Sequence, residues 1–274
     1  MDSQKLNESL KFISHKIKTK PSLAIVLGSG LGSFGDELSE KIIVNCKDIP
    51  HYPVPRVAGH AGVWIFGKLE NTPILALKGR VHTYEGYSAR EVTYPIRLLA
   101  KMGINRLVVT NAAGAINKQF HPGDLMLITD HINFLFDSPL IGDNTLSAEQ
   151  RFIDLSQAYD PEFIKAALIV SRHENISLQT GILICFRGPS YETAAEIGMA
   201  RILGADAGTM STVPEVIAAN QLKMRVLGIS CITNMATGIL DQKLSHDEVT
   251  ETANRIKDKF VRLMKAILKQ LPAW

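Results

Sequence analysis

The sequence predicts an α/β fold, with a single domain whose central mixed β-sheet is flanked by helices. Short runs of apolar and β-branched residues recur along the 274 residues, and helical patterns separate many of them. No internal repeat, low-complexity tract or Gly/Ser/Pro linker divides the chain. We therefore expect residues 1–274 to form one domain.

The first segment, residues 1–20, predicts an amphipathic helix. It mixes lysines with Leu6, Leu10, Ile13 and Ile17, which stand at helical spacing. This pattern differs from the unbroken apolar core of a signal peptide. No apolar run approaches the roughly 20 residues that a membrane span needs. We therefore expect a cytoplasmic protein that does not insert into membranes.

Eight apolar runs predict the strands of the sheet. They begin at Leu23, Ile42, Val63, Pro73, Arg106, Asp124, Gly181 and Arg225. Helical patterns lie between many of these runs and after the last one. They cover Arg90 to Lys101, Pro161 to His173, Ala194 to Leu203, Val213 to Lys223 and Val249 to Leu271. The segment from Leu135 to Ala158 has no strong strand pattern and predicts a long loop, of a kind that is often functional.

Four Ser or Thr residues precede a Glu by three positions, which is the pattern of a capping box and predicts a helix start. They are Ser88, Thr193, Thr212 and Ser245. Polar or aromatic residues cluster beside each start, and His246 stands at the first helical position of the last one. Because ligands of α/β sheets gather at strand ends and helix N-termini, we expect these clusters to meet at one cleft.

Charge and cysteine usage exclude two classes of function. The net charge of +3 is small and evenly spread, whereas a nucleic-acid surface needs clustered Lys and Arg. Cys46, Cys185 and Cys231 lie far apart and form neither a zinc-binding pair nor a disulfide framework. Cys185 and Cys231 fall in predicted strands, so we expect buried, inert thiols there.

The turn Val26–Gly32 (VLGSGLG) follows the first predicted strand and can bring backbone N–H groups close to an anion. Gly28 and Gly30 fit the dinucleotide-binding fingerprint, but Ser33 stands at its third glycine position. Asp48 lies near the distance at which that fingerprint places a ribose-binding carboxylate. A nicotinamide-dependent dehydrogenase and a plain strand-to-loop junction both remain open from this turn alone.

Basic side chains follow the fourth predicted strand. Arg80 and His82 are two positions apart, so an extended chain directs both to the same side, and an Arg fork beside an imidazole suits phosphate. His60 lies in a loop with glycines close on either side. The segment Asn111–Ala115 adds small residues and backbone donors at a further strand end.

Together, eight ordered segments resemble the purine nucleoside phosphorylases of the trimeric class. They are VLGSGLG, GHAG from Gly59, KGRVHTYEGYS from Lys78, VVTNAAGAIN from Val108, LITDHIN from Leu127, GPSYETAAEI from Gly188, MSTVPEV from Met210 and ITNMATG from Ile232. The resemblance implies a nucleoside phosphorylase-like fold and a homotrimer. It also implies phosphorolysis of purine ribonucleosides or deoxyribonucleosides to the free base and the α-sugar 1-phosphate. Inorganic phosphate is then a co-substrate, and we expect no metal and no cofactor.

The resemblance also implies a role for individual residues. The phosphate would be surrounded by Ser29, His60, Arg80, His82, the N–H of Ala112, and Ser211. The purine would be contacted by Tyr191, Glu192 and Asn234, and the ribose by Tyr84, Met210 and His246. We expect His82, Glu192 and Asn234 to take part in catalysis.

The chemistry of bond cleavage accounts for such a set of groups. Breaking the N-glycosidic bond builds positive charge on the sugar and negative charge on the purine, and both need stabilisation. Asn234 can hydrogen-bond around N7 and O6, and Glu192 can accept from the N1–H of a 6-oxopurine. Adenine has no N1–H, and an unpaired buried carboxylate costs about 1–3 kcal/mol or more. We therefore expect inosine and guanosine to react better than adenosine.

Alternatives remain within the family and outside it. The methylthioadenosine phosphorylase branch typically carries Asp at the position of Asn234 and lacks Glu at 192, and xanthosine-accepting relatives share ITNMA. A nucleoside-binding protein without turnover would use the same cleft. Two departures from the family pattern concern the site: Gly208-Thr209 replaces Val-Gly beside Met210, and Ala148 stands where a Phe commonly reaches the neighbouring subunit. Phe152 is the candidate to replace that Phe.

Overall fold

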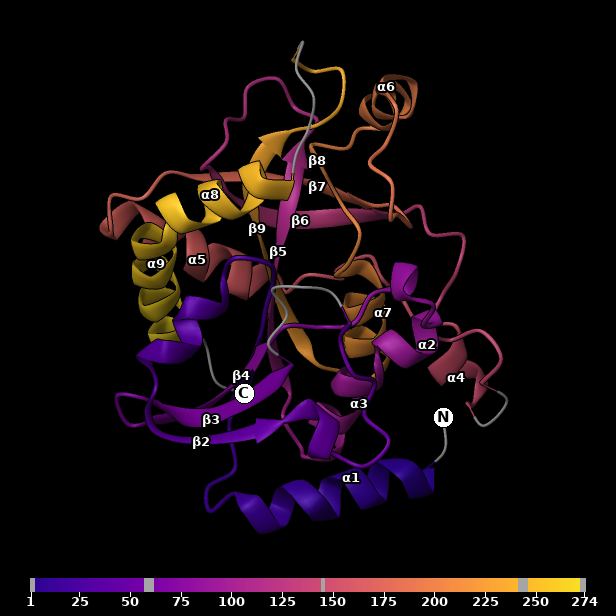
Figure 1. Ribbon diagram of the computed structural model, residues 1–274, viewed down its shortest axis with the longest axis vertical. Coiled ribbons are helices and arrows are strands. Elements are labelled where there is room, and N and C mark those ends of the chain that lie inside the picture. Colours follow the sequence, from indigo (N-terminus) through magenta and orange to yellow (C-terminus); the bar gives the residue numbers. More distant parts are fainter. Residues whose placement is uncertain (1–2, 57–61, 144–145, 241–245, 272–274) are drawn as a thin grey trace.

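The computed structural model describes residues 3–56, 62–143, 146–240 and 246–271 and has the predicted α/β architecture (Figure 1). The strands are β1 (Leu23–Leu27), β2 (Ser39–Asn45), β3 (Val63–Leu69), β4 (Thr72–Lys78), β5 (Arg106–Ala115), β6 (Leu125–Asn133), β7 (Leu178–Cys185), β8 (Ala207–Thr209) and β9 (Arg225–Met235). The α-helices are α1 (Ser3–Lys16), α2 (Ala89–Val92), α3 (Tyr94–Lys101), α4 (Ala148–Arg151), α5 (Pro161–His173), α6 (Ala194–Ile202), α7 (Val213–Gln221), α8 (His246–Arg255) and α9 (Lys257–Gln270). Short 3₁₀ turns are η1 (Gly32–Glu37), η2 (Cys46–Asp48) and η3 (Thr83–Glu85).

The strands form one mixed sheet in the order β2-β3-β4-β1-β5-β8-β7-β6-β9, and β5 also pairs with β9. Since β5, β8, β7, β6 and β9 each pair with the next and β9 returns to β5, these five strands close a ring. β1 runs parallel to β4 and β5, and β5 runs parallel to β9. The carboxyl ends of these four strands therefore lie at the same edge of the sheet.

The alternation of side chains along the central strands divides the core into two layers. In β1, Ala24 and Val26 belong to a cluster that also contains residues of α1, α3 and α7. Leu23, Ile25 and Leu27 point to the opposite face, where they join residues of α5 and α9. Figure 1 shows these two helix groups on opposite sides of the sheet. The sheet is thus covered on both faces, as its apolar strands require.

Two of the four predicted capping boxes are confirmed, at the starts of α2 and α6. Ser88 Oγ accepts from Glu91 N and Thr193 Oγ1 accepts from Glu196 N, each at 3.2 Å. The helix start predicted at Thr212 is confirmed, since α7 begins at Val213, but the Thr212 side chain does not cap the helix. Thr212 Oγ1 instead accepts from Arg80 Nη1 and from Asn111 Nδ2, each at 3.0 Å. Ser245 lies outside the described residues.

Other elements differ from the sequence prediction in detail. The predicted long loop contains the short helix α4, where Gln150 N donates to Ser147 Oγ at 3.3 Å. The predicted last helix is divided at Ile256, whose φ of −97° and ψ of 4° separate α8 from α9. The three-residue strand β8 had no detectable pattern. None of the described helices is long and apolar enough to cross a membrane.

The three cysteines are buried, as predicted for Cys185 and Cys231. Burial raises the pKa of the Cys46 and Cys231 thiols to about 12 and raises the pKa of Cys185 as well. All three therefore remain protonated and poorly reactive in the folded protein.

Candidate active site

A cavity opens where β1, β4, β5 and β9 end and where β8 enters the strand ring. It collects side chains from segments spread over the whole chain, from the glycine turn after β1 to the end of β9. The predicted site residues that line it are Ser29, Arg80, His82, Tyr84, Ala112, Tyr191, Glu192, Met210, Ser211 and Asn234. His60 lies outside the described residues. His246 begins α8, but its side chain is likewise outside the description.

The glycine turn is bound directly to the neighbouring strand β5. Leu31 N donates to Gly28 O at 3.0 Å, and Gly28 N donates to Thr110 Oγ1 at 3.2 Å. Thr110 Oγ1 in turn donates to Val26 O at 2.9 Å. A β-carbon on Gly28 would lie only 2.7 Å from the Cα of Asn111, so this approach requires glycine. The turn thereby places Ser29 at the cavity, next to the end of β5.

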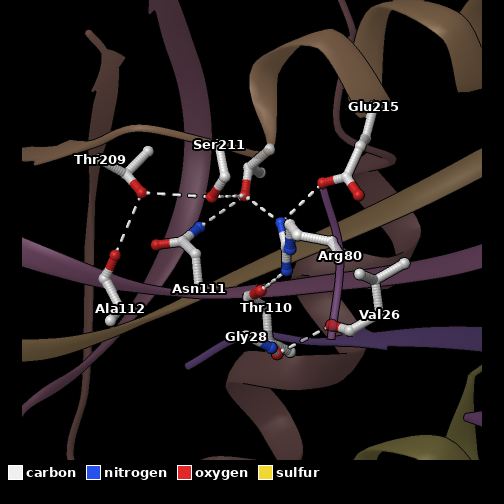
Figure 2. A network of polar contacts seen from close by, with 10 residues as sticks. Val26, Gly28, Arg80, Thr110, Asn111, Ala112, Thr209, Ser211 and Glu215 are labelled. Atoms are coloured by element: carbon white, nitrogen blue, oxygen red, sulfur yellow. Dashed lines mark hydrogen bonds and ion pairs between the residues drawn. The ribbon is translucent and has the colours of Figure 1, made fainter. Parts of the chain in front are cut away.

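Arg80 is buried at the cavity wall, and its guanidinium is held by protein acceptors (Figure 2). Nη1 donates to Glu215 Oε2 at 2.6 Å and to Thr212 Oγ1 at 3.0 Å, and Nη2 donates to Thr110 O. The sequence predicts that the guanidinium fork suits phosphate. The structure shows that part of the fork is bonded to the protein and orients Arg80, because a buried cation needs a paired anion.

Glu215 is the buried anion opposite Arg80. Burial raises the pKa of the Glu215 carboxyl, and the adjacent Arg80 guanidinium opposes that shift. The contact of 2.6 Å between the two side chains, each about 5% exposed or less, fixes the positive charge of Arg80 at the cavity wall. An anion bound in the cavity would therefore face a guanidinium whose orientation is fixed.

His82 is held by Glu85 and by Tyr84. Its Nδ1 lies 3.1 Å from Glu85 Oε1, and its ring stacks on Tyr84 with centroids 4.6 Å apart and planes 12° apart. Burial lowers the pKa of His82, so its imidazole is neutral at neutral pH. Burial alone would raise the pKa of Glu85, but hydrogen bonds from His82 and from the backbone N–H of Arg56 lower it.

These states fix the tautomer of His82. An ionised Glu85 only accepts hydrogen bonds, so His82 Nδ1 carries the proton and Nε2 is the acceptor. A neutral His82 of this tautomer suits a ligand that carries a proton on oxygen, such as a monoprotonated phosphate.

The cavity is also lined by a carboxylate and an amide, those of Glu192 and Asn234. Asn234 Oδ1 accepts from Thr233 Oγ1 at 2.9 Å, and Asn234 Nδ2 donates to Met235 O at 3.0 Å. Burial raises the pKa of Glu192, and the Glu196 carboxylate adds to the shift. Tyr191 lies at the rim and is 43% exposed.

The sequence predicts no side-chain role for several polar residues at or beside the cavity, chiefly Glu85, Asn111, Thr209, Thr212 and Glu215. Glu85 follows His82 by three residues in η3, a spacing that offered a signal. The spacing of Thr212 and Glu215 predicts a helix start but no role for either residue in the site. Asn111 lines the cavity and donates to Thr212 Oγ1 at 3.0 Å.

The Gly208-Thr209 departure now has a structural description. Thr209 Oγ1 donates to Ala112 O at 3.1 Å and lies 3.4 Å from Ser211 Oγ. A β-carbon on Gly208 would lie 3.3 Å from Phe186 Cε2, so glycine leaves room for that ring beside the cavity.

Asp48, on which the nicotinamide alternative depends, lies in η2 after strand β2 and is not among the residues that line the cavity. The hypothesis that the glycine turn binds a dinucleotide therefore lacks the ribose-binding carboxylate that it requires.

Comparisons with known proteins agree with this geometry. The model of the phosphorylase superfamily matches residues 22–269. Purine nucleoside phosphorylase 1 of Bacillus subtilis is 48% identical over 266 residues, which cover 97% of this chain and 98% of the relative. Purine nucleoside phosphorylase of Rattus norvegicus is 40% identical and covers 99% of this chain and 95% of its own length.

Solved structures show the same likeness over the full length. Schistosoma mansoni purine nucleoside phosphorylase in complex with adenosine superposes with a TM-score of 0.93 at 32% identity, covering 100% of this chain and 99% of that one. A Schistosoma enzyme with hypoxanthine superposes with a TM-score of 0.92 at 32% identity, covering 99% of both chains.

Proposed function

The chain belongs to the phosphorylase superfamily, and we propose that it catalyses the phosphorolysis of purine nucleosides, with inosine and guanosine as preferred substrates. The products are the free purine and the α-(deoxy)ribose 1-phosphate. Inorganic phosphate is the co-substrate, and the reaction needs no metal or cofactor. We place the protein in the cytoplasm.

One observation carries the proposal: the same cavity is lined by groups that suit an anion and by groups that suit a purine. The first set contains Ser29, Arg80, His82 and Ser211, and the second contains Glu192 and Asn234. We place the base against the second set and phosphate against the first. The sugar would then lie between them, with phosphate facing the anomeric carbon.

The two sets of groups stabilise opposite charges during bond cleavage. Phosphate balances the positive charge that grows on the sugar and then bonds to the anomeric carbon, while the electron pair of the broken bond goes to the purine. Asn234 stabilises that purine charge around N7 and O6, and Glu192 accepts the N1–H. Tyr84 and Met210, which line the cavity, contact the ribose, and Tyr191 packs against the base.

The pair of Glu192 and Asn234 also favours this function over the methylthioadenosine branch. That branch typically carries Asp in place of Asn234 and lacks Glu at 192. Both Glu192 and Asn234 line the cavity here. Xanthosine is an alternative substrate, because relatives that accept xanthosine share the segment ITNMA, which contains Asn234.

We further propose a homotrimer in which a neighbouring copy completes each site. The resemblance to the trimeric class is one support. A second is that Phe152, at the end of α4, is 79% exposed and is therefore accessible to a neighbouring copy. Phe152 would then replace the Phe that the family commonly has at the position of Ala148.

The proposal is tested by the phosphate dependence of turnover. We expect the purified protein to release hypoxanthine from inosine only when inorganic phosphate is present, and to form one sugar phosphate per base. Adenosine serves as the poorer substrate for comparison. Release of base without phosphate, or reduction of NAD in place of base release, would overturn the proposal.

A further inference from the structure

A strained backbone turn adjoins Ser211, one of the cavity residues that we expect to bind phosphate. Thr212 has φ 74° and ψ −53°, and Val213 N donates to Ser211 O at 2.8 Å across it. This is a γ-turn of the rare, positive-φ kind, and a β-branched residue adopts it only under constraint. Such a turn persists where the surrounding structure holds it, and it often serves the site that it borders.

The turn brings two hydroxyl groups together behind the cavity. Thr212 Oγ1 lies 3.3 Å from Ser211 Oγ and is almost fully buried, with Thr212 only 1% exposed. Its oxygen accepts from Arg80 Nη1 and from Asn111 Nδ2, each at 3.0 Å. A hydroxyl oxygen has two acceptor sites and one proton. Both acceptor sites of Thr212 are occupied, so its proton is directed to Ser211 Oγ.

The hydroxyl of Thr209, the other neighbour of Ser211, donates its hydrogen bond elsewhere. Thr209 Oγ1 donates to Ala112 O at 3.1 Å, so toward Ser211 it acts only as an acceptor, at a long 3.4 Å. Ser211 Oγ accepts a hydrogen bond from Thr212 Oγ1, and its own O–H is left to donate either to Thr209 across this long contact or into the cavity. A ligand oxygen that only accepts, as in phosphate, is a better acceptor than the distant Thr209 hydroxyl.

We infer that Thr212 is a positioning residue, whose hydroxyl sets Ser211 to donate into the phosphate subsite and steadies Arg80 beside it. The inference rests on the proposed function and deepens it. It assigns to Thr212 the direction of the hydrogen bonds at that subsite, not a contact with substrate. Glu215 supports the arrangement from the far side of Arg80, at 2.6 Å.

The test compares Thr212→Val with Thr212→Ser. Valine keeps the shape and the branched β-carbon but removes the hydroxyl, whereas serine restores the hydroxyl. We expect Thr212→Val to raise the KM for phosphate by about tenfold, because Ser211 is then no longer set to donate to phosphate, and a hydrogen bond to a charged ligand is worth about that factor. The KM for inosine at saturating phosphate should change less than about twofold. Thr212→Ser should recover most of the phosphate affinity.

Thr93→Val is the matched control. Thr93 is fully buried and its hydroxyl donates to Arg90 O at 3.0 Å, but it does not line the cavity. This variant reports the effect of losing a buried threonine hydroxyl elsewhere, and we expect both KM values to stay at the wild-type level. Should Thr212→Val fail to fold, Thr212→Ala repeats the comparison with a smaller side chain at the strained position.

Calorimetric titration with inorganic phosphate alone separates the two proposals. Wild-type protein that binds phosphate without releasing purine contradicts the proposed function, and the comparison of Thr212→Val with wild type still decides the inference. An unchanged phosphate affinity in Thr212→Val, or an equal loss for phosphate and inosine, overturns the role of Thr212. A wild type that binds no phosphate overturns both proposals.

Discussion

At the scale of single residues, the polar partners of the site come from positions far apart in the chain. The ion pair of Arg80 with Glu215 joins the loop after β4 to the first turn of α7. Motif resemblance predicted Arg80, His82, Glu192 and Asn234 as cavity residues, and the structure brings them together. It did not predict which groups hold Arg80, because side-chain pairing depends on contacts that only the folded chain creates.

The amide of Asn234 tests base selection at this scale. In Asn234→Asp the acceptor that faces Thr233 is kept, but the donor Nδ2, now bonded to Met235 O, becomes an acceptor. We expect kcat/KM for inosine to fall by at least about tenfold, because the charge on N7 and O6 loses its donor. The ratio of adenosine to inosine activity should rise, since an acceptor suits the 6-amino group.

Measuring kcat/KM for both nucleosides checks this prediction. Asn220→Asp is a suitable control, because the Asn220 amide donates to Ala158 O at 2.9 Å and does not line the cavity. An unchanged activity ratio in Asn234→Asp would remove Asn234 from base selection.

Glu192 predicts a pH dependence of substrate preference. Burial raises the pKa of this carboxyl, so the ionised form that accepts N1–H is lost already as pH falls through that raised value. We expect kcat/KM for inosine to drop on this acidic side. Protonated Glu192 can donate to N1 of adenosine, so the adenosine-to-inosine ratio should rise as the pH falls.

Initial rates for both nucleosides across the acidic range measure this effect. Glu192→Gln cannot ionise, so its activity ratio should stay flat over the same range. A wild-type ratio that is equally flat would contradict the role of Glu192. His82 titrates separately, with a pKa that burial lowers, and both proteins share that change.

At the scale of elements, the capping-box pattern predicted the cap correctly where both of its side chains bond within the same helix turn. The boxes at Ser88 and Thr193 close within their own first turns. The helix start at Thr212 is correct, but its hydroxyl does not cap α7, because Arg80 and Asn111, which are distant in sequence, donate to it. Strand β8 was missed because three residues are too few for any periodic pattern.

The start of helix α5 offers a stability test. Asp160 Oδ1 accepts from Glu162 N and Phe163 N, each at 3.0 Å, and Asp160 Oδ2 accepts from Arg225 Nε at 2.6 Å. Asp160→Ala removes the cap and the ion pair together. We expect the free energy of unfolding to fall by about 1–3 kcal/mol.

The pH dependence of this contribution has a definite sign. Burial alone would raise the pKa of Asp160, but the bonds from Arg225 and the two N–H groups lower it. A lowered folded-state pKa gives stability that is present above the unfolded pKa and is lost as pH falls through the folded value. Denaturant unfolding near neutral and acidic pH should therefore show the gap between wild type and Asp160→Ala narrowing in acid.

Ser147→Ala is the reference substitution for this series. Ser147 caps the exposed four-residue helix α4, so its loss should cost less than the loss of Asp160. Equal effects of the two substitutions would show that Arg225 adds nothing to the cap.

At the scale of the whole molecule, the strand ring was beyond sequence prediction. The sequence predicts that strands and helices alternate and that the sheet is mixed. It contains no signal that β9 pairs with both β5 and β6, because the pairing partners are separated by about a hundred residues. The site depends on that closure, since Gly208 and Thr209 reach the cavity from a strand of the ring.

Assembly is tested at the same scale. We expect sedimentation equilibrium to give the mass of three chains, and Phe152→Asp to shift the protein toward smaller species at micromolar concentration. A charge at an exposed contact residue opposes association because it must lose its water. Ile43→Asp is the control, since Ile43 is 60% exposed on strand β2 at the edge of the sheet. A wild-type mass of one chain would contradict the trimer.

Ring closure has a consequence for how this scaffold diversifies. Strand β8 is paired with β5 on one side and β7 on the other, so a shift of its backbone would break ladder hydrogen bonds at both edges. We therefore expect substrate preference to change more readily through side chains on this strand than through its backbone. Gly208 leaves room for Phe186, and the Thr209 hydroxyl contacts Ala112 O and Ser211 Oγ, on a strand that is paired at both edges.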